Sequence, residues 1–97
     1  MTTAAGQPIA SESPATVTLR LFAAARSAAG RDELMVPSGS LRDVLTTATS
    51  QLPSGFATLL EICSILVDGL VVDADVEPGH PVAPGSTIDI LPPFAGG

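Results

Sequence analysis

Residues 40–52 read SLRDVLTTATSQL and form the clearest helical pattern in the chain. Ser40 is followed three residues later by Asp43, which resembles a capping box, where the hydroxyl accepts a backbone N–H of the first helical turn. Apolar residues then recur at the spacing of one helical face: Leu41, Val44, Leu45, Ala48 and Leu52. Pro53 and Gly55 end the pattern. The segment predicts one main helix with a single apolar stripe, which needs a sheet to cover.

Two extended segments precede this helix. Thr16–Phe22 alternates polar residues with the apolar residues Val17, Leu19 and Leu21, which is the period of a strand with one buried face. Glu33–Val36 is a second, shorter extended run. The intervening residues 23–30, AAARSAAG, are helix formers closed by a glycine. These segments predict a hairpin whose long connection contains a short helix.

The segments after the main helix are shorter. They are, in chain order, a helical turn at residues 56–60, a strand at Ser64–Val67, a return strand at Leu70–Val72 and a last strand at Thr87–Leu91. Asp68-Gly69 is a strong signal for a two-residue hairpin turn. Residues 73–85 hold three prolines, two glycines and three acids, so we predict a solvated loop.

The order of these elements predicts an α+β domain, because the strands group around one helix instead of repeating as βαβ units. A mixed four- or five-stranded sheet packed on one main helix is the β-grasp arrangement. We expect this domain to span residues 16–91. Residues 1–15 hold one isolated large apolar residue, Ile9, and predict a disordered leader. Residues 92–97 form a separate C-terminal tail.

Composition excludes several classes of function. The 97 residues carry a formal charge of −6, with four arginines scattered among ten acids and no lysine, which argues against nucleic acid as a partner. The acidic balance favours docking on basic protein surfaces. Cys63 is the only cysteine, so no disulfide can form within the chain. The chain shows neither a signal peptide nor a membrane-spanning run, and we expect a cytoplasmic protein.

The polar candidates for chemistry inside the domain all favour structural roles. Cys63 adjoins an apolar strand and is interpreted as a small buried hydrophobe in place of a sulfur-transfer thiol. His80 has no second ligand nearby to complete a metal site. Asp73, Asp75 and Glu77 alternate as calcium ligands sometimes do, but the glycine and final glutamate of an EF-hand loop are missing. We predict no catalytic residue, metal site or bound cofactor on this chain.

The C-terminal tail, LPPFAGG at residues 91–97, has a different character. Pro92 and Pro93 have fixed φ and disfavour helix, so the chain leaves the sheet as an extended arm. Gly96 and Gly97 carry no side chains and leave a strip of bare backbone that fits a narrow channel. The carboxylate of Gly97 is an exposed, unhindered nucleophile. The tail is therefore the predicted working part of the molecule.

The chain resembles the small subunits of molybdopterin synthase, the MoaD-like relatives of ubiquitin. The resemblance covers residues 16–97 and rests on LFAAAR at residues 21–26, VDG at residues 67–69, His80-Pro81 and the tail LPPFAGG. The final PPFAGG is its most specific part. The thiazole-pathway sulfur carriers, which are ThiS-like, share the fold and the last two glycines but usually lack the double proline.

The resemblance implies a carrier cycle. An E1-like adenylating partner would use ATP and Mg²⁺ to join the Gly97 carboxylate to AMP, and a sulfur donor would then replace AMP to leave a thiocarboxylate. The tail would carry this sulfur into the large subunit of molybdopterin synthase, where two such sulfurs would build the dithiolene. The ATP site and the catalytic bases would belong to the partners.

The resemblance also implies a docking face at the root of the tail. Phe94 would enter the partner's tunnel ahead of the glycines, and Leu91 stands where an aromatic residue is often found. The alternative is that Phe22 and Leu91 are core residues of their strands. The implied partner-binding residues are Phe22, Val71, Leu91, Pro92, Pro93, Phe94, Ala95, Gly96 and Gly97, with Gly97 as the covalent carrier residue.

Three functions from different classes remain open at this point. The chain could be a sulfur-carrier subunit, for molybdopterin, thiazole or another sulfur-requiring synthesis. It could be a modifier conjugated to other proteins, although the absence of lysine excludes lysine-linked chains on this protein. It could also be a ubiquitin-like binding module without covalent chemistry.

Overall fold

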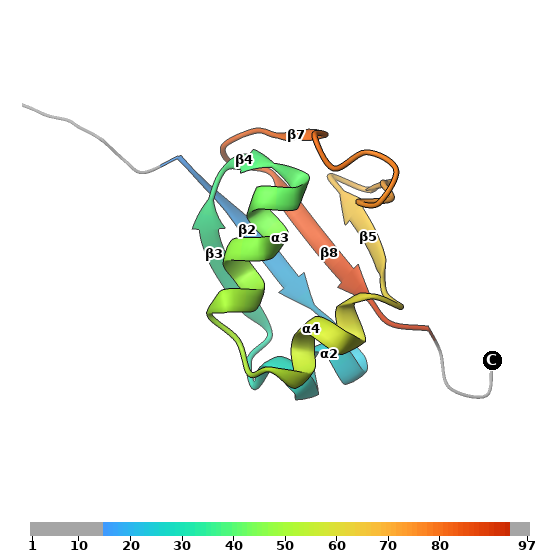
Figure 1. Ribbon diagram of the computed structural model, residues 1–97. Coiled ribbons are helices and arrows are strands. Elements are labelled where there is room, and N and C mark those ends of the chain that lie inside the picture. Colours follow the sequence, from blue (N-terminus) through green and yellow to red (C-terminus); the bar gives the residue numbers. More distant parts are fainter. Residues whose placement is uncertain (1–14, 94–97) are drawn as a thin grey trace, which may run out of the picture.

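The computed structural model describes residues 15–93 (Figure 1). The predicted leader, apart from Ala15, and the tail residues from Phe94 to Gly97 lie outside the described residues. The elements in chain order are β2 (Thr16–Leu21), α2 (Ala23–Ala29), β3 (Glu33–Pro37), β4 (Gly39–Ser40), α3 (Leu41–Ser50), α4 (Gly55–Leu60), β5 (Ser64–Val67), β6 (Leu70–Val71), β7 (Pro81–Val82) and β8 (Thr87–Leu91).

Five strands form one mixed sheet in the order β3-β2-β8-β5-β6. The central strands β2 and β8 run parallel, and the remaining neighbours are antiparallel. Helix α3 crosses one face of this sheet, while α2 and α4 pack together at one end (Figure 1). The predicted α+β class, the five-stranded mixed sheet and the β-grasp arrangement are confirmed.

The core lies between α3 and the sheet. Alternate residues of β2, β3, β5 and β8 are buried, as the period of two in the sequence indicates. The predicted apolar stripe of the main helix is buried in the same cluster, and so is Phe56 of α4. Burying these aliphatic side chains is the main force that holds the sheet and the helices together.

Local signals define where the helices begin and end. The Ser40 hydroxyl accepts the backbone N–H of Asp43 at 3.1 Å, as the capping pattern predicts. Gly30 ends α2 with a φ of 78°, a left-handed conformation that favours glycine. Helix α3 ends at Ser50, two residues before the end of the predicted stripe, but Leu52 still packs into the core.

The prediction that residues 73–85 form only a solvated loop was wrong in part. Within this segment β7 pairs with β4 in a second, two-stranded sheet, and Val82 is buried. The backbone carbonyls of Pro78 and His80 accept the N–H groups of Arg42 and Leu41 at 2.9 and 2.8 Å. The segment thus satisfies donors of the first turn of α3 that the helix itself leaves unpaired. A two-residue strand has no detectable period, so the sequence pattern could not reveal it.

Candidate docking face and root of the tail

The face of the five-stranded sheet opposite α3 has no helix of the described chain over it, and we call it the open face. Three pairs of residues on neighbouring strands show which side chains lie on this face. Leu66 of β5 faces Val71 of β6, Leu66 also faces Asp89 of β8, and Ser64 faces Leu91. Because paired residues point to the same side of a sheet, Val71, Leu66 and Leu91 share the open face.

Phe22 lies at the edge of this face. It follows β2 directly, two residues after Arg20, and its backbone N–H donates to the carbonyl of Ile90 at 3.4 Å. The Phe22 side chain is 38% exposed and that of Val71 is 69% exposed. Leu91 is half-buried. Neither Phe22 nor Leu91 belongs to the buried core, so the alternative that both are core residues is not supported.

The structure therefore brings three predicted docking residues, Phe22, Val71 and Leu91, to one face. Leu66 is half-buried on the same face and was not predicted, because three consecutive apolar residues, 65–67, show no preference between the two faces. Met35 of β3 is a further exposed apolar residue, and the burial alternation of β3 places it on the open face. Docking by these residues stays a prediction.

The tail begins beside this face. Strand β8 ends at Leu91, at the end of the molecule where α2 and α4 lie (Figure 1). Pro92 is buried and Pro93 is exposed, so Pro93 presents the available proline surface. The predicted contacts of Phe94, Ala95, Gly96 and Gly97 lie outside the described residues.

An ion pair occupies the middle of the open face. Arg20 of β2 and Asp89 of β8 are neighbours in the parallel register, and the Arg20 Nε lies 2.7 Å from the Asp89 Oδ1. The hydrogen bond to Asp89 raises the pKa of Arg20 above its ordinary value, with a smaller contribution from Glu33. The Arg20 guanidinium also lies 5.7 Å from the centre of the Phe22 ring. Thr18 and Thr87, the preceding pair of the same register, also lie on this face, so the open face combines a polar centre with exposed apolar residues near the root of the tail.

The sequence pattern of the ThiS family matches residues 19–97, most of the described domain and the whole tail. The chain belongs to the ThiS family. Members of this family are small carrier proteins, which agrees with the expectation that the chain is not itself an enzyme. No curated protein sequence matches the chain.

Solved structures support the same fold for this ThiS-family chain. SAMP1 from Haloferax volcanii has a TM-score of 0.72 at 20% identity, and the match covers 84% of this chain and 99% of that one. SAMP1 from Methanosarcina acetivorans, a small archaeal modifier protein, has a TM-score of 0.65 at 28% identity over 86% and 97% of the two chains. A chain in the complex of subunits 1 and 2 of the molybdopterin-converting factor from Helicobacter pylori has a TM-score of 0.63 at 22% identity. The match covers 84% of this chain and 99% of that one. At identities below 25% the likeness shows the fold alone.

The polar residues that were considered for chemistry within the domain, Cys63, Asp73 and His80, have neighbours that suit a structural role. The Cys63 Sγ donates to the carbonyl of Leu59 at 3.3 Å, and burial raises the pKa of its thiol, so the reactive thiolate is disfavoured. The Asp73 carboxylate accepts the backbone N–H of Asp75 at 2.8 Å, which closes a turn. His80 Nδ1 lies 3.7 Å from the carboxylate of Glu77.

Within residues 15–93, no group of three or more histidine, cysteine or acidic side chains could hold a metal ion. No helix of the same residues has the length and apolar character that crossing a bilayer requires.

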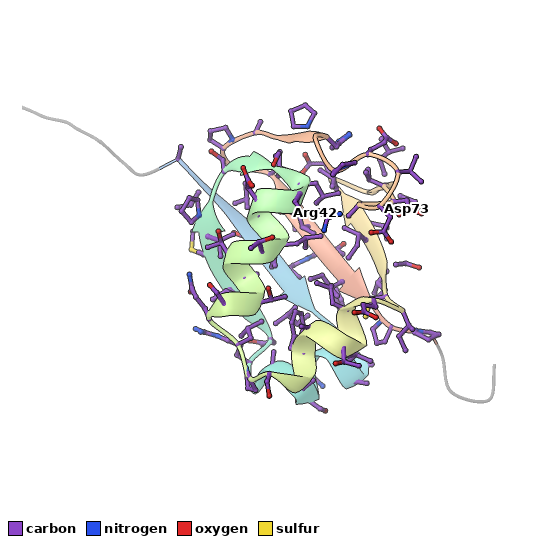
Figure 2. The ribbon with its side chains drawn as sticks, viewed as in Figure 1. Arg42 and Asp73 are labelled. Atoms are coloured by element: carbon purple, nitrogen blue, oxygen red, sulfur yellow. The ribbon has the colours of Figure 1, made fainter. Side chains whose placement is uncertain are left out.

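A groove of about 450 Å³ lies at the β5–β6 edge of the ThiS-family domain. Its walls come from α3, from α4, from β5 and from the loop after β6, and Ser64 and Val71 of the open face also line it. Figure 2 shows Arg42 extending from α3 toward the loop that contains Asp73. An Arg42 Nη2 lies 3.6 Å from the Asp75 carboxylate. The sequence could not predict this groove, because three segments far apart in the chain form it.

Proposed function

We propose that this ThiS-family chain is a sulfur carrier and the small subunit of a molybdopterin synthase. The observation that carries the proposal is the family match, which continues through Gly97 at the end of the tail. The open face supports it, because exposed apolar residues lie at the root of that tail. A carrier needs such a surface next to its reactive end in order to present that end to enzymes that hold the catalytic groups.

The chemistry would take place at the Gly97 carboxylate. One carboxylate oxygen attacks the α-phosphorus of ATP on an adenylating partner, and pyrophosphate leaves with Mg²⁺ balancing its charge. Sulfur at the oxidation level of sulfide, HS⁻, then attacks the acyl carbon, and AMP leaves with the electron pair of the broken C–O bond. The C-terminus is then a thiocarboxylate, a softer and stronger nucleophile than the carboxylate. This chain supplies the carrier group and the docking surface.

The large subunit of molybdopterin synthase is the proposed acceptor of this sulfur. The Helicobacter pylori complex contains subunits 1 and 2 of a molybdopterin-converting factor, so a protein of this fold is found beside a second subunit. The final PPFAGG of this chain favours the molybdopterin pathway over the thiazole pathway. We infer a cytoplasmic location, because the proposed partners act on soluble intermediates.

The deciding experiment removes Gly97. The arm from Pro92 to Gly97 reaches at most about 3.3–3.6 Å per residue, so the deletion withdraws the acyl carbon by about 3.5 Å. Misplacement by about 1 Å can lower a rate about 100-fold, and we expect thiocarboxylate formation to be lost. Mass spectrometry after incubation with the adenylating partner, ATP and a sulfur source measures the product. Extension by one bulky residue should have the same effect.

Two controls accompany this experiment. A pull-down with the large subunit should show that the Gly97 deletion still binds, because the open face is unchanged. Circular dichroism should show an unchanged fold. If the deletion variant gains sulfur and supports molybdopterin synthesis at a near-normal rate, the carrier proposal is wrong.

A second candidate function is covalent modification of other proteins. It is favoured by the similarity to two structures of SAMP1, a small archaeal modifier protein. The two functions differ in product. A modifier would give amide-linked conjugates to lysines of other proteins in its own cells, whereas a sulfur carrier would give a free chain with sulfur in place of one terminal oxygen.

A further inference from the structure

Arg20 and Asp89 form a two-point contact on the open face, although 69 residues separate them in the chain. Besides the 2.7 Å contact of the Arg20 Nε with Oδ1, the Arg20 Nη2 donates to Oδ2 of Asp89 at 3.1 Å. Two parallel hydrogen bonds between a guanidinium and a carboxylate fix the plane and the direction of the arginine side chain. The Asp89 side chain is mostly covered while that of Arg20 is half-exposed, so the carboxylate acts as the anchored partner.

The fixed guanidinium lies against the aromatic ring that the docking face exposes. Its central carbon is 5.7 Å from the centroid of Phe22, within the distance of about 6 Å at which a cation attracts the face of a ring. The backbone of Phe22 is held as well. Its N–H donates to the carbonyl of Ile90 at 3.4 Å, and its carbonyl accepts the N–H of Ala25 at 2.9 Å. Phe22 is thus held at its backbone and at its ring.

We propose that Arg20, clamped by Asp89, is a positioning residue that holds the Phe22 ring in the orientation in which it docks on the adenylating partner. This inference rests on the proposed function of the open face. An exposed aromatic anchor loses rotational freedom when it binds, and that loss opposes association. A ring already held by Arg20 loses less, so the ion pair strengthens docking through the orientation of the Phe22 ring.

A double-mutant cycle tests whether Arg20 acts through Phe22. The variants are Arg20→Met, Phe22→Leu and the double substitution, and the measurement is the affinity for the E1-like adenylating enzyme of the same genome. We expect Arg20→Met to weaken binding about 2- to 5-fold, the size of an exposed cation–ring interaction. In the Phe22→Leu background the same substitution should have no further effect.

The matched control is Arg42→Met. It removes the same charge from a similarly exposed arginine that also pairs with an aspartate, but on the helix side. Its affinity should equal that of the wild type. All affinities are measured where each variant is fully folded. Additive losses in the cycle would mean that Arg20 contacts the partner directly, and an Arg20→Met variant with unchanged affinity would mean that it has no role in docking. Either result overturns the proposal.

A measurement on the free protein separates this inference from the proposed function. NMR should show contacts between the Phe22 ring and the Arg20 side chain and one dominant χ1 rotamer of Phe22. Arg20→Met should disperse the rotamers, and Arg20→Lys should disperse them less. An unchanged rotamer in Arg20→Met would refute the positioning role. Failure of the wild type to gain a thiocarboxylate would instead refute the carrier function.

Discussion

At the scale of single residues, Phe22 and Phe56 illustrate how position decides the role of a side chain. Both are phenylalanines in a chain with few aromatic residues, but Phe22 is 38% exposed on the open face while Phe56 is 0% exposed in the core. Exposed area contributes little to folding and is available for binding. We therefore assign Phe56 to stability and expect Phe22 to contribute to docking.

Replacing each phenylalanine by alanine should separate these roles. Phe56→Ala should lower the free energy of unfolding by about 3–5 kcal/mol, because it leaves a cavity in the core. Phe22→Ala should cost clearly less stability but weaken partner binding by about 2 kcal/mol, as an aromatic anchor does. Chemical denaturation and partner titration measure the two quantities. A Phe22→Ala variant with intact affinity and a loss of stability like that of Phe56→Ala would place Phe22 in the core.

Asp68 connects the β5–β6 hairpin to the last strand. Its carboxylate accepts the backbone N–H of Thr87 at 2.9 Å. That hydrogen bond, followed by one from the Ser86 hydroxyl, lowers the pKa of Asp68. Because the folded state favours the charged form, the stabilisation is present above the ordinary aspartate pKa of about 3.9 and is lost as the pH falls through the lower folded value.

Asp68→Asn should therefore flatten the acid side of the stability profile. The amide still accepts the Thr87 N–H and tolerates the left-handed φ of 50° at this position, but it does not titrate. Urea unfolding between about pH 6 and about pH 3 should show a smaller decrease for the variant than for the wild type. Parallel decreases in the two proteins would contradict the assigned hydrogen bond.

At the scale of elements, the short pair β4–β7 connects the main helix to a segment that looks like a loop in sequence. Val82 of β7 is 3% exposed, whereas Val76 in the same segment is 73% exposed. The backbone next to β7 also caps the first turn of α3. Strand β7 thus contributes a side chain to the core, and the backbone before it accepts hydrogen bonds from the first turn of α3.

Matched substitutions test this assignment. Val82→Ala should destabilise the protein by about 2 kcal/mol, because it removes buried methyl groups next to the helix start. Val76→Ala makes the same chemical change at an exposed position and should alter stability by less than about 0.5 kcal/mol. Thermal and urea unfolding of both variants measure the difference. Equal changes in stability for the two variants would mean that the whole segment is a solvated loop, as the sequence predicts.

At the scale of the whole molecule, the described domain contains its core between residues 17 and 90. The backbone carbonyl of Ala15 accepts the N–H of Ser38 at 2.8 Å, the first interaction along the described chain that ties it to the domain. The sequence before Ala15 predicts no cluster of apolar side chains that could pack on the domain. The domain and its open face should therefore form without residues 1–14.

Deleting residues 1–14 should change the melting temperature by no more than a few degrees. Deleting residues 1–18 removes half of β2, a central strand with neighbours on both sides, and should prevent folding. Scanning calorimetry of the two truncations gives the comparison. A clear loss of stability in the shorter truncation would show that the leader packs on the domain.

Most elements of the fold and the composition of the tail can be predicted from local sequence patterns alone. The period of two in Thr16–Phe22, the stripe and the cap of residues 40–52, and the Asp68-Gly69 turn are local signals, because each depends on neighbours within a few residues. Prolines and glycines likewise act on the backbone where they stand. The resemblance rested on short segments, residues 21–26 and 67–69, His80-Pro81 and the tail, and it named three residues of the open face.

The pairing of these elements became known from the folded domain. The parallel register of β2 and β8 joins Arg20 to Asp89, with the Arg20 guanidinium beside the Phe22 ring, and no local pattern specifies a register between strands so far apart. The same holds for Leu66 on the open face and for Val82 in β7. The physical reason is that local periodicity fixes which side of a strand is buried, whereas packing of the complete core selects which strand becomes its neighbour.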